Sequence, residues 1–270
     1  MSNSDDVESG QMVSKKEDQR DGLGEIIRTV IYAVIIALGI RTIAFEPFNI
    51  PSKSMEPTLL VGDYLFVSKY AYGYSHYSLP LSPPIFKGRI FASPVKRGDV
   101  AVFKWPYDNR TDYIKRIVGL PGDRIQVRHG ILYINGEEVK RTRVKDFVEK
   151  LGDGELHHVK QYRETLPNGV SYMVLDRQPD NPLDDTQVYV VPPGHYFAMG
   201  DNRDNSADSR IPTSPAGVGF VPAENLIGRA EVLFFSTDGS AKLWEPWTWP
   251  GATRWSRIFT SLRPHVDKKP

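Results

Sequence analysis

The sequence predicts a mainly β protein that follows one apolar helix near the N-terminus. Glycine–aspartate turns precede strand-like runs at three places, and no helical periodicity longer than two turns occurs between residues 60 and 235. The composition agrees, because 22 Gly and 21 Pro accompany 13 Tyr, 12 Phe and 5 Trp, and such residues favour turns and short strands. The turn pairs are Gly62-Asp63, Gly98-Asp99 and Gly122-Asp123, without a fixed period that would indicate a solenoid.

Charge and cysteine content exclude several classes of function. Lys+Arg 34 against Asp+Glu 33 gives a net charge of +1, so the chain has no overall basic field to attract nucleic acid. The absence of cysteine excludes disulfides, thiol catalysis and thiolate metal sites. It does not fix the compartment, because a chain of 270 residues can bury enough apolar surface without covalent crosslinks.

The N-terminal region divides into a polar tail and an apolar segment. Residues 1–25 have almost no apolar content and are expected to be disordered. Residues 26–46 reach about the 20 residues needed to cross a bilayer, provided that Arg28 and Arg41 extend to the headgroups and Pro47 closes the helix. A buried core helix is an alternative, whereas a cleaved secretory signal lacks the small residues that its cleavage site needs.

We favour a single membrane anchor for residues 26–46, and basic residues suggest its orientation. They favour a cytoplasmic N-terminus and an exported C-terminal portion, residues 47–270. The basic residues before and within the start of the segment are Lys15, Lys16, Arg20 and Arg28, against Arg41 and Lys53 beyond it.

Two later regions have unusual composition. Residues 140–187 are more polar and less patterned, which suggests an insertion or a smaller lobe. Near the C-terminus, four tryptophans occur within 12 residues: Trp244, Trp247, Trp249 and Trp255. They form either a small hydrophobic cluster that closes the fold or, given an anchor, an aromatic contact with the membrane interface.

The segment IPSKSMEPTLLVGD, residues 50–63, is a candidate site. Pro51 and Pro57 exclude a long helix or a central strand and constrain a backbone that carries Ser52, Ser54 and Thr58. The ordinary role of Ser54 is a helix cap or turn residue. It becomes a nucleophile only beside a base.

The segment MGDNRDNSADSR, residues 199–210, is the second candidate. A calcium-binding EF-hand loop starting at Asp204 would place Ser209 where glycine belongs and Pro215 where the bidentate glutamate belongs, so this match fails. A solvated loop with Asx turns remains the alternative to a functional role.

Lys115 is the best candidate for a base. The six histidines show no clear association with a nucleophile motif. In a strand over residues 112–118, Lys115 shares a face with Tyr113 and Ile117, while Arg116 points the other way. Apolar surroundings would lower the pKa of this lysine, although a surface lysine on a strand is the more frequent case.

Taken together, these segments resemble the bacterial type I signal peptidases (leader peptidases). An apolar N-terminal segment is followed in order by IPSKSMEPTL, RGDVAVFKWP, DYIKRIVGLPGD, MGDNRDNSADSR and GFVP. The resemblance implies a serine–lysine dyad with Ser54 as nucleophile and Lys115 as general base, and an oxyanion site formed by the Ser54 backbone N–H and the Ser52 hydroxyl. It implies that Ser206 orients the lysine and that Asp208 and Arg210 support the site. It also implies small-residue pockets lined by Phe48, Ile50, Met55, Leu59, Tyr113 and Ile114.

The resemblance also implies the fold and the setting. The expected fold has twisted antiparallel sheets with a smaller, non-catalytic β-lobe inserted at about residues 124–195. The expected activity is serine endopeptidase cleavage of signal peptides after small residues at −1 and −3, without metal or cofactor. The expected location is the bacterial inner membrane, single-pass, with the catalytic domain on the periplasmic side. The expected partners are preproteins, the lipid bilayer and the export translocon nearby, and no nucleic acid.

Two alternatives differ in sequence features. A self-cleaving repressor-type peptidase shares the Ser–Lys arrangement but needs a DNA-binding helix-turn-helix, for which this N-terminus gives no sign. A non-catalytic, membrane-tethered β-domain would be indicated by loss of Ser54 or Lys115, and both are present.

Overall fold

The computed structural model describes residues 24–41, 43–79, 81–150, 155–178, 180–241 and 244–266. The chain divides into two compact units, Met1–Ala44 and Phe45–Pro270. The tail expected at residues 1–25 lies outside the described residues except for its last two, which are helical.

The first unit contains a helix over residues 24–41. Apolar side chains on this helix are exposed, Ile26 and Ile36 each by 62%. No helix within the described ranges is both long and apolar enough to cross a membrane, so the anchor predicted at 26–46 is not confirmed. The chain is already in a β-strand at Phe45, before the proline at which we expected the helix to end.

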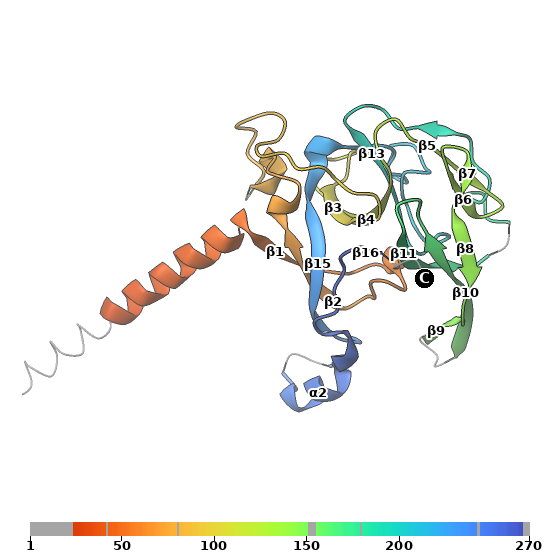
Figure 1. Cartoon of the computed structure of the whole chain (residues 1–270). Helices are drawn as coiled ribbons and strands as arrows, with labels where there is room; N and C mark the ends of the chain where they lie inside the picture. The colour runs from red at the N-terminus through yellow and green to blue at the C-terminus, as the bar shows by residue number, and fades with distance from the viewer. Residues whose placement is uncertain are drawn as a thin grey trace, which may run out of the picture. The chain divides into compact units, whose positions relative to one another are not determined.

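The second unit is built on a seven-stranded antiparallel sheet in the order β1-β2-β15-β3-β4-β13-β14 (Figure 1). Pro47 is accommodated because β1 is an edge strand, where a missing backbone N–H is tolerated. The strands are β1 (Phe45–Asn49), β2 (Asp63–Ser68), β3 (Val100–Lys104), β4 (Asp112–Gly119), β13 (His195–Met199), β14 (Val221–Pro222) and β15 (Leu226–Ser236).

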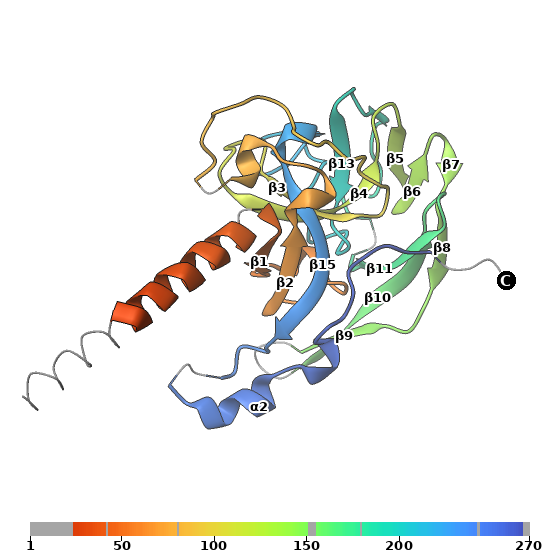
Figure 2. The ribbon, with the colours of Figure 1, turned by 60° about the vertical axis from the view of Figure 1, so that its left-hand side comes forward.

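The chain between β4 and β13 forms two smaller sheets. One has the order β16-β11-β10-β8, with β9 paired to β10, and the other has the order β12-β5-β6-β7. The C-terminal segment joins the first of them, because β16 pairs with β11 (Figures 1 and 2). Their strands are β5 (Arg124–Arg128), β6 (Ile131–Ile134), β7 (Glu137–Glu138), β8 (Lys140–Arg143), β9 (Phe147–Lys150), β10 (Leu156–Thr165), β11 (Val170–Asp176), β12 (Tyr189–Val190) and β16 (His265–Val266).

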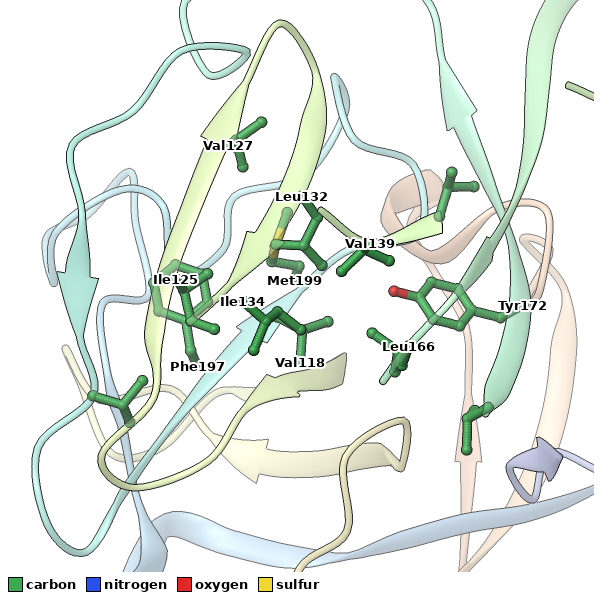
Figure 3. Close-up of a cluster of buried hydrophobic side chains, with 13 residues drawn as sticks. Val118, Ile125, Val127, Leu132, Ile134, Val139, Leu166, Tyr172, Phe197 and Met199 are labelled. Atoms are coloured by element: carbon green, nitrogen blue, oxygen red, sulfur yellow. The ribbon is translucent and has the colours of Figure 1, made fainter. Parts of the chain in front are cut away.

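A shared core joins the smaller sheets to the large one. Val118, Phe197 and Met199 of the large sheet pack with Ile125 and Leu132 in one buried cluster (Figure 3). The last two belong to the smaller sheets, which are together called the lobe below. The boundaries predicted for the insertion, about 124–195, stay a prediction, because Phe45–Pro270 forms a single compact unit.

The remaining helices of the described chain are short: η1 (Lys53–Met55), η2 (Lys69–Ala71), η3 (His76–Ser78), η4 (Ala223–Asn225), η5 (Pro246–Thr248), α2 (Trp249–Ala252) and η6 (Trp255–Arg257). The tryptophans of the C-terminal region are not packed inside: Trp244 is 74% exposed and Trp247 is 76% exposed. This exposure disagrees with the interpretation that they close the fold.

The three Gly-Asp pairs form the same turn. Gly62, Gly98 and Gly122 have φ values of 89°, 98° and 89°, a region that glycine adopts readily. The aspartate that follows each glycine accepts a hydrogen bond from the backbone N–H three residues earlier, at 2.8, 3.0 and 2.6 Å. Each Gly-Asp pair therefore forms a turn that precedes the next strand, as the sequence predicted.

Candidate active site

A cleft of about 520 Å³ lies between the end of β1, helix η1, β3 and β4, and part of the 199–210 segment borders it. Ser52, Lys53 and Ser54 line one side, and Lys115 lines another. The two segments that the sequence singled out therefore meet at one cleft, although 135 residues separate them.

The central contact of this cleft joins Ser54 to Lys115. Helix η1 presents Ser54, which is 8% exposed, and β4 presents Lys115, which is 3% exposed. The Lys115 Nζ donates to Ser54 Oγ over 2.7 Å and to the Ile114 carbonyl over 3.0 Å. A serine hydroxyl within direct hydrogen-bond reach of an amine is the arrangement that a nucleophile and its base require.

The environment of Lys115 favours the neutral amine. Burial lowers the pKa of Lys115 to about 8, although the nearby carboxylates of Asp208 and Asp201 act in the opposite direction. Its amino group also lies 5.4 Å from the centre of the Tyr113 ring. With a pKa of about 8, about one lysine in ten is unprotonated at pH 7 and about half are at pH 8, so a neutral amine is available as a general base.

The backbone around Ser54 is held by the 199–210 segment. The Asn202 backbone N–H donates to the Ser54 carbonyl over 3.1 Å, and the Asn202 side-chain amide donates to the Lys53 carbonyl over 3.0 Å. The Ser52 hydroxyl lies 3.3 Å from Ser54 Oγ. The two groups predicted to bind an oxyanion, the Ser54 N–H and the Ser52 hydroxyl, thus belong to one short, fixed turn.

Ser206 is buried next to this turn. A Cβ at Gly200 would overlap both the Ser206 hydroxyl and the Ser54 carbonyl, so only glycine permits this packing. The Ser206 Oγ has no hydrogen-bond partner among the described residues, and the bonds recorded for Lys115 go to Ser54 and Ile114. The lysine-orienting role of Ser206 stays a prediction.

Asp208 and Arg210 form a buried pair beneath the site. Arg210 donates to both Asp208 oxygens, each over 2.9 Å, and the Gly200 N–H donates to the same carboxylate over 3.0 Å. Burial opposes ionisation of Asp208, but Arg210 outweighs it and lowers the pKa of the carboxyl. Asp208 therefore stays ionised, and Arg210 holds its carboxylate in place while neutralising most of its charge.

Two further ion pairs were not predicted. Arg116 makes two hydrogen bonds to Asp201, at 2.8 and 2.7 Å, and Arg203 makes two to Glu164, one of them at 2.7 Å. The alternation of acids and arginines in residues 199–210 signals ion pairing, but nothing in the sequence identifies Arg116 on β4 and Glu164 on β10 as the distant partners.

The predicted substrate-pocket residues fall into two groups. Phe48, Ile50, Tyr113 and Ile114 line the cleft. Met55 and Leu59 are fully buried and lie outside its lining, in the core cluster beneath. These two residues were assigned to the substrate pockets from the family resemblance, and that part of the assignment stays a prediction.

Comparison with known proteins identifies the family. The family described as "Signal peptidase, peptidase S26" matches residues 23–235. The signal peptidase I of Rickettsia canadensis is 44% identical over 218 residues, 78% of this chain and 79% of that protein. That of Rickettsia typhi is 41% identical over 252 residues, 86% and 90% of the two chains. A signal peptidase I crystal structure from Enterococcus faecalis has 25% identity and a TM-score of 0.29, covering 51% of this chain and 97% of that one.

These matches make the chain a hydrolase of the serine peptidase class. It belongs to the signal peptidase family, peptidase S26, among the type I signal peptidases, as its motifs predicted.

Proposed function

We propose that this chain is a membrane-anchored serine endopeptidase that removes N-terminal signal peptides from exported preproteins, using Ser54 as nucleophile and Lys115 as general base. The observation that carries the proposal is the 2.7 Å contact between Lys115 Nζ and Ser54 Oγ in a buried position beside a cleft. The names of the family and of its curated relatives support the substrate class.

The proposed reaction uses this geometry. Neutral Lys115 accepts the hydroxyl proton as Ser54 Oγ attacks the scissile carbonyl, and the lysine then delivers this proton to the leaving amine. The Ser54 N–H and the Ser52 hydroxyl stabilise the developing oxyanion. Water, deprotonated by the same lysine, hydrolyses the acyl-enzyme. One amine thus performs the proton transfers that a histidine performs in Ser-His-Asp sites.

The cleft supports a preference for small residues at −1 and −3. Phe48, Ile50, Tyr113 and Ile114 give it an apolar wall, so a charged substrate side chain would lose its hydration without gaining a partner. One extra methylene is disfavoured by only about 1–3 kcal/mol. We therefore expect alanine to be accepted, valine to be cleaved more slowly and glutamate to be rejected.

The helix at residues 24–41 supports membrane attachment. Exposed isoleucines, valines and leucines surround it, and apolar side chains on this scale need a cover. Arg28 and Arg41 near its ends can extend to the headgroups. We place the enzyme in the inner membrane as a single-pass protein with a cytoplasmic N-terminus, a periplasmic catalytic unit and the export translocon nearby.

The test is cleavage of a purified preprotein by the detergent-solubilised chain, followed by N-terminal sequencing of the product. We expect Ser54→Ala to abolish turnover. Lys115→Arg should be nearly as damaging, because guanidinium stays charged and cannot act as a base. Substitution of glutamate for alanine at −1 of the substrate should stop cleavage. Retained activity in Lys115→Arg would refute the dyad, and equal cleavage of the two substrates would refute the pocket assignment.

A further inference from the structure

Arg177, immediately after β11, joins three separate segments at the edge of the site. Its Nε donates to Asn202 Oδ1 over 3.2 Å, its Nη1 to Glu149 over 2.8 Å and its Nη2 to Glu56 over 3.3 Å. Glu149 lies on β9 of the lobe, and Glu56 follows the nucleophile turn. Every nitrogen of this guanidinium is therefore used to connect the lobe, the turn and the 199–210 segment.

Asn202 transmits this arrangement to the peptide that carries the predicted oxyanion donor. Its amide donates to the Lys53 carbonyl over 3.0 Å. The Lys53–Ser54 peptide is trans, so its carbonyl and its N–H point in opposite directions. A bond that fixes the Lys53 carbonyl on one side therefore fixes the direction of the Ser54 N–H on the other side.

The orientation of the Asn202 amide depends on Arg177. Only the amide oxygen can accept from the Arg177 Nε, which leaves the NH₂ group to donate to Lys53. Glu149 also contacts the Lys53 ammonium, so its carboxylate holds both the arginine and the turn. The two positive charges, on Lys53 and Arg177, balance the two negative charges, on Glu56 and Glu149.

We propose that Arg177 and Asn202 are positioning residues for the oxyanion site, with Glu149 and Glu56 holding the arginine in place. This inference rests on the proposed function, since it concerns the alignment of the Ser54 N–H during acyl transfer. Neither side chain needs to touch the substrate. Their effect is to keep a donor aimed at the place where negative charge develops, and misplacement of such a group by about 1 Å can cost about a hundredfold in rate.

Two substitutions separate positioning from charge and packing. Arg177→Lys keeps the positive charge for Glu149 and Glu56 but cannot form the three-pronged contact that includes Asn202. Asn202→Asp keeps the size and the acceptor for Arg177 but removes the donor to the Lys53 carbonyl. The matched controls are Arg97→Lys, at an arginine that pairs with Asp123 over 2.8 Å, and Asn225→Asp, at an amide that donates to the Lys104 carbonyl over 2.9 Å.

The experiment uses the full chain in detergent micelles and measures kcat, KM and inhibition by two peptides of one signal-peptide sequence. The first ends in an aldehyde at −1, whose carbon bonds to Ser54 Oγ and whose oxygen then occupies the oxyanion site. The second has a methylene in place of the scissile carbonyl and so has no such oxygen. For Arg177→Lys and Asn202→Asp we expect kcat to fall by about 10- to 100-fold, with a parallel loss of aldehyde affinity.

The same two variants should keep KM and affinity for the methylene peptide. Arg177→Lys should also keep the midpoint of the pH profile, because it leaves Lys115 and the number of charges near it unchanged. The controls should change thermal stability but not kcat. The inference is overturned if Arg177→Lys or Asn202→Asp keeps wild-type kcat, or if both peptides lose affinity equally. If Ser54→Ala cleaves as well as the wild type, the proposed function itself fails, and this result is distinct from the failure of the positioning role alone.

Discussion

In the proposed dyad, burial of the amine is what makes Lys115 usable as a base, and the folded protein bears the free-energy cost of that burial. The ordinary pKa of 10.5 falls to about 8 because the charged form is desolvated. Ser54 gains a hydrogen-bond partner from the same burial. Ser54 and Lys115 were predicted as the dyad from the motifs that contain them, and the structure places the two side chains in contact.

The first prediction concerns pH. The rate should rise as Lys115 loses its proton, with a midpoint near the pKa of about 8.

The same pKa affects stability. Because the pKa of Lys115 is lower in the folded state than in the unfolded state, the folded state binds fewer protons between these two pKa values. The free energy of unfolding therefore rises with pH across that window. Lys115→Met removes this cost and should stabilise the protein at pH 7 by about 3 kcal/mol, a gain that shrinks from pH 8 to 10.5. Urea unfolding of the wild type and of Lys115→Met at several pH values measures this difference in stability. A stability difference that does not vary with pH would contradict the buried, neutral lysine.

At the scale of elements, the 199–210 segment is largely buried and contacts several strands. It is not the solvated loop that the sequence allowed as an alternative to a functional role. Asp201, Arg203 and Asp208 are each at most 4% exposed, and each is paired with an opposite charge. The pair of Asp201 with Arg116 connects the segment to β4, and the pair of Arg203 with Glu164 connects it to β10. Both strands thus contact the segment whose Asn202 binds the turn that contains Ser54.

The second prediction tests the connection to β10. Glu164→Leu leaves Arg203 as a buried, unpaired charge and should destabilise the protein by about 3–5 kcal/mol. The double variant Glu164→Leu/Arg203→Met removes both charges and should recover most of that loss. Denaturant midpoints of the wild type and the three variants, including Arg203→Met alone, check this. A double variant that is no more stable than Glu164→Leu would show that the two effects are independent.

Local elements were more predictable than their partners. The Gly-Asp turns were visible because glycine at positive φ and an aspartate acceptor are properties of adjacent residues. The pairing of Arg203 with Glu164, or of Arg177 with Glu149, was not visible, since each depends on how strands far apart in the chain come together. The core cluster that contains Met55 and Leu59 was not visible for the same reason, since it includes Val100 and Leu233 from distant strands.

At the scale of the whole molecule, sequence predicted the mainly β class and the family, and it left the ends of the chain open. The apolar run before Phe45 was recognisable, but its length as a helix was not, because β1 takes Phe45 and Glu46 into the sheet. The tryptophan-rich region was recognisable as unusual, yet only the structure distinguishes exposed side chains from a packed cluster. Both regions have exposed apolar side chains. The rules that predict how a buried core packs do not predict what covers such side chains.

The last prediction separates these two regions as means of membrane attachment. If the helix is the anchor, the full chain should stay with membranes in alkaline carbonate, and a chain that starts at Phe45 should be released while still cleaving a soluble peptide. Ile35→Arg should weaken retention, since a charge at the centre of a spanning helix costs about 2.5–3.5 kcal/mol or more, and Ile35→Leu is the matched control. A C-terminal alkaline phosphatase fusion, active only after export, reports the orientation. Release of the full chain would refute the anchor, retention of the shortened chain would assign attachment to the exposed tryptophans, and an inactive, stable fusion would refute the orientation.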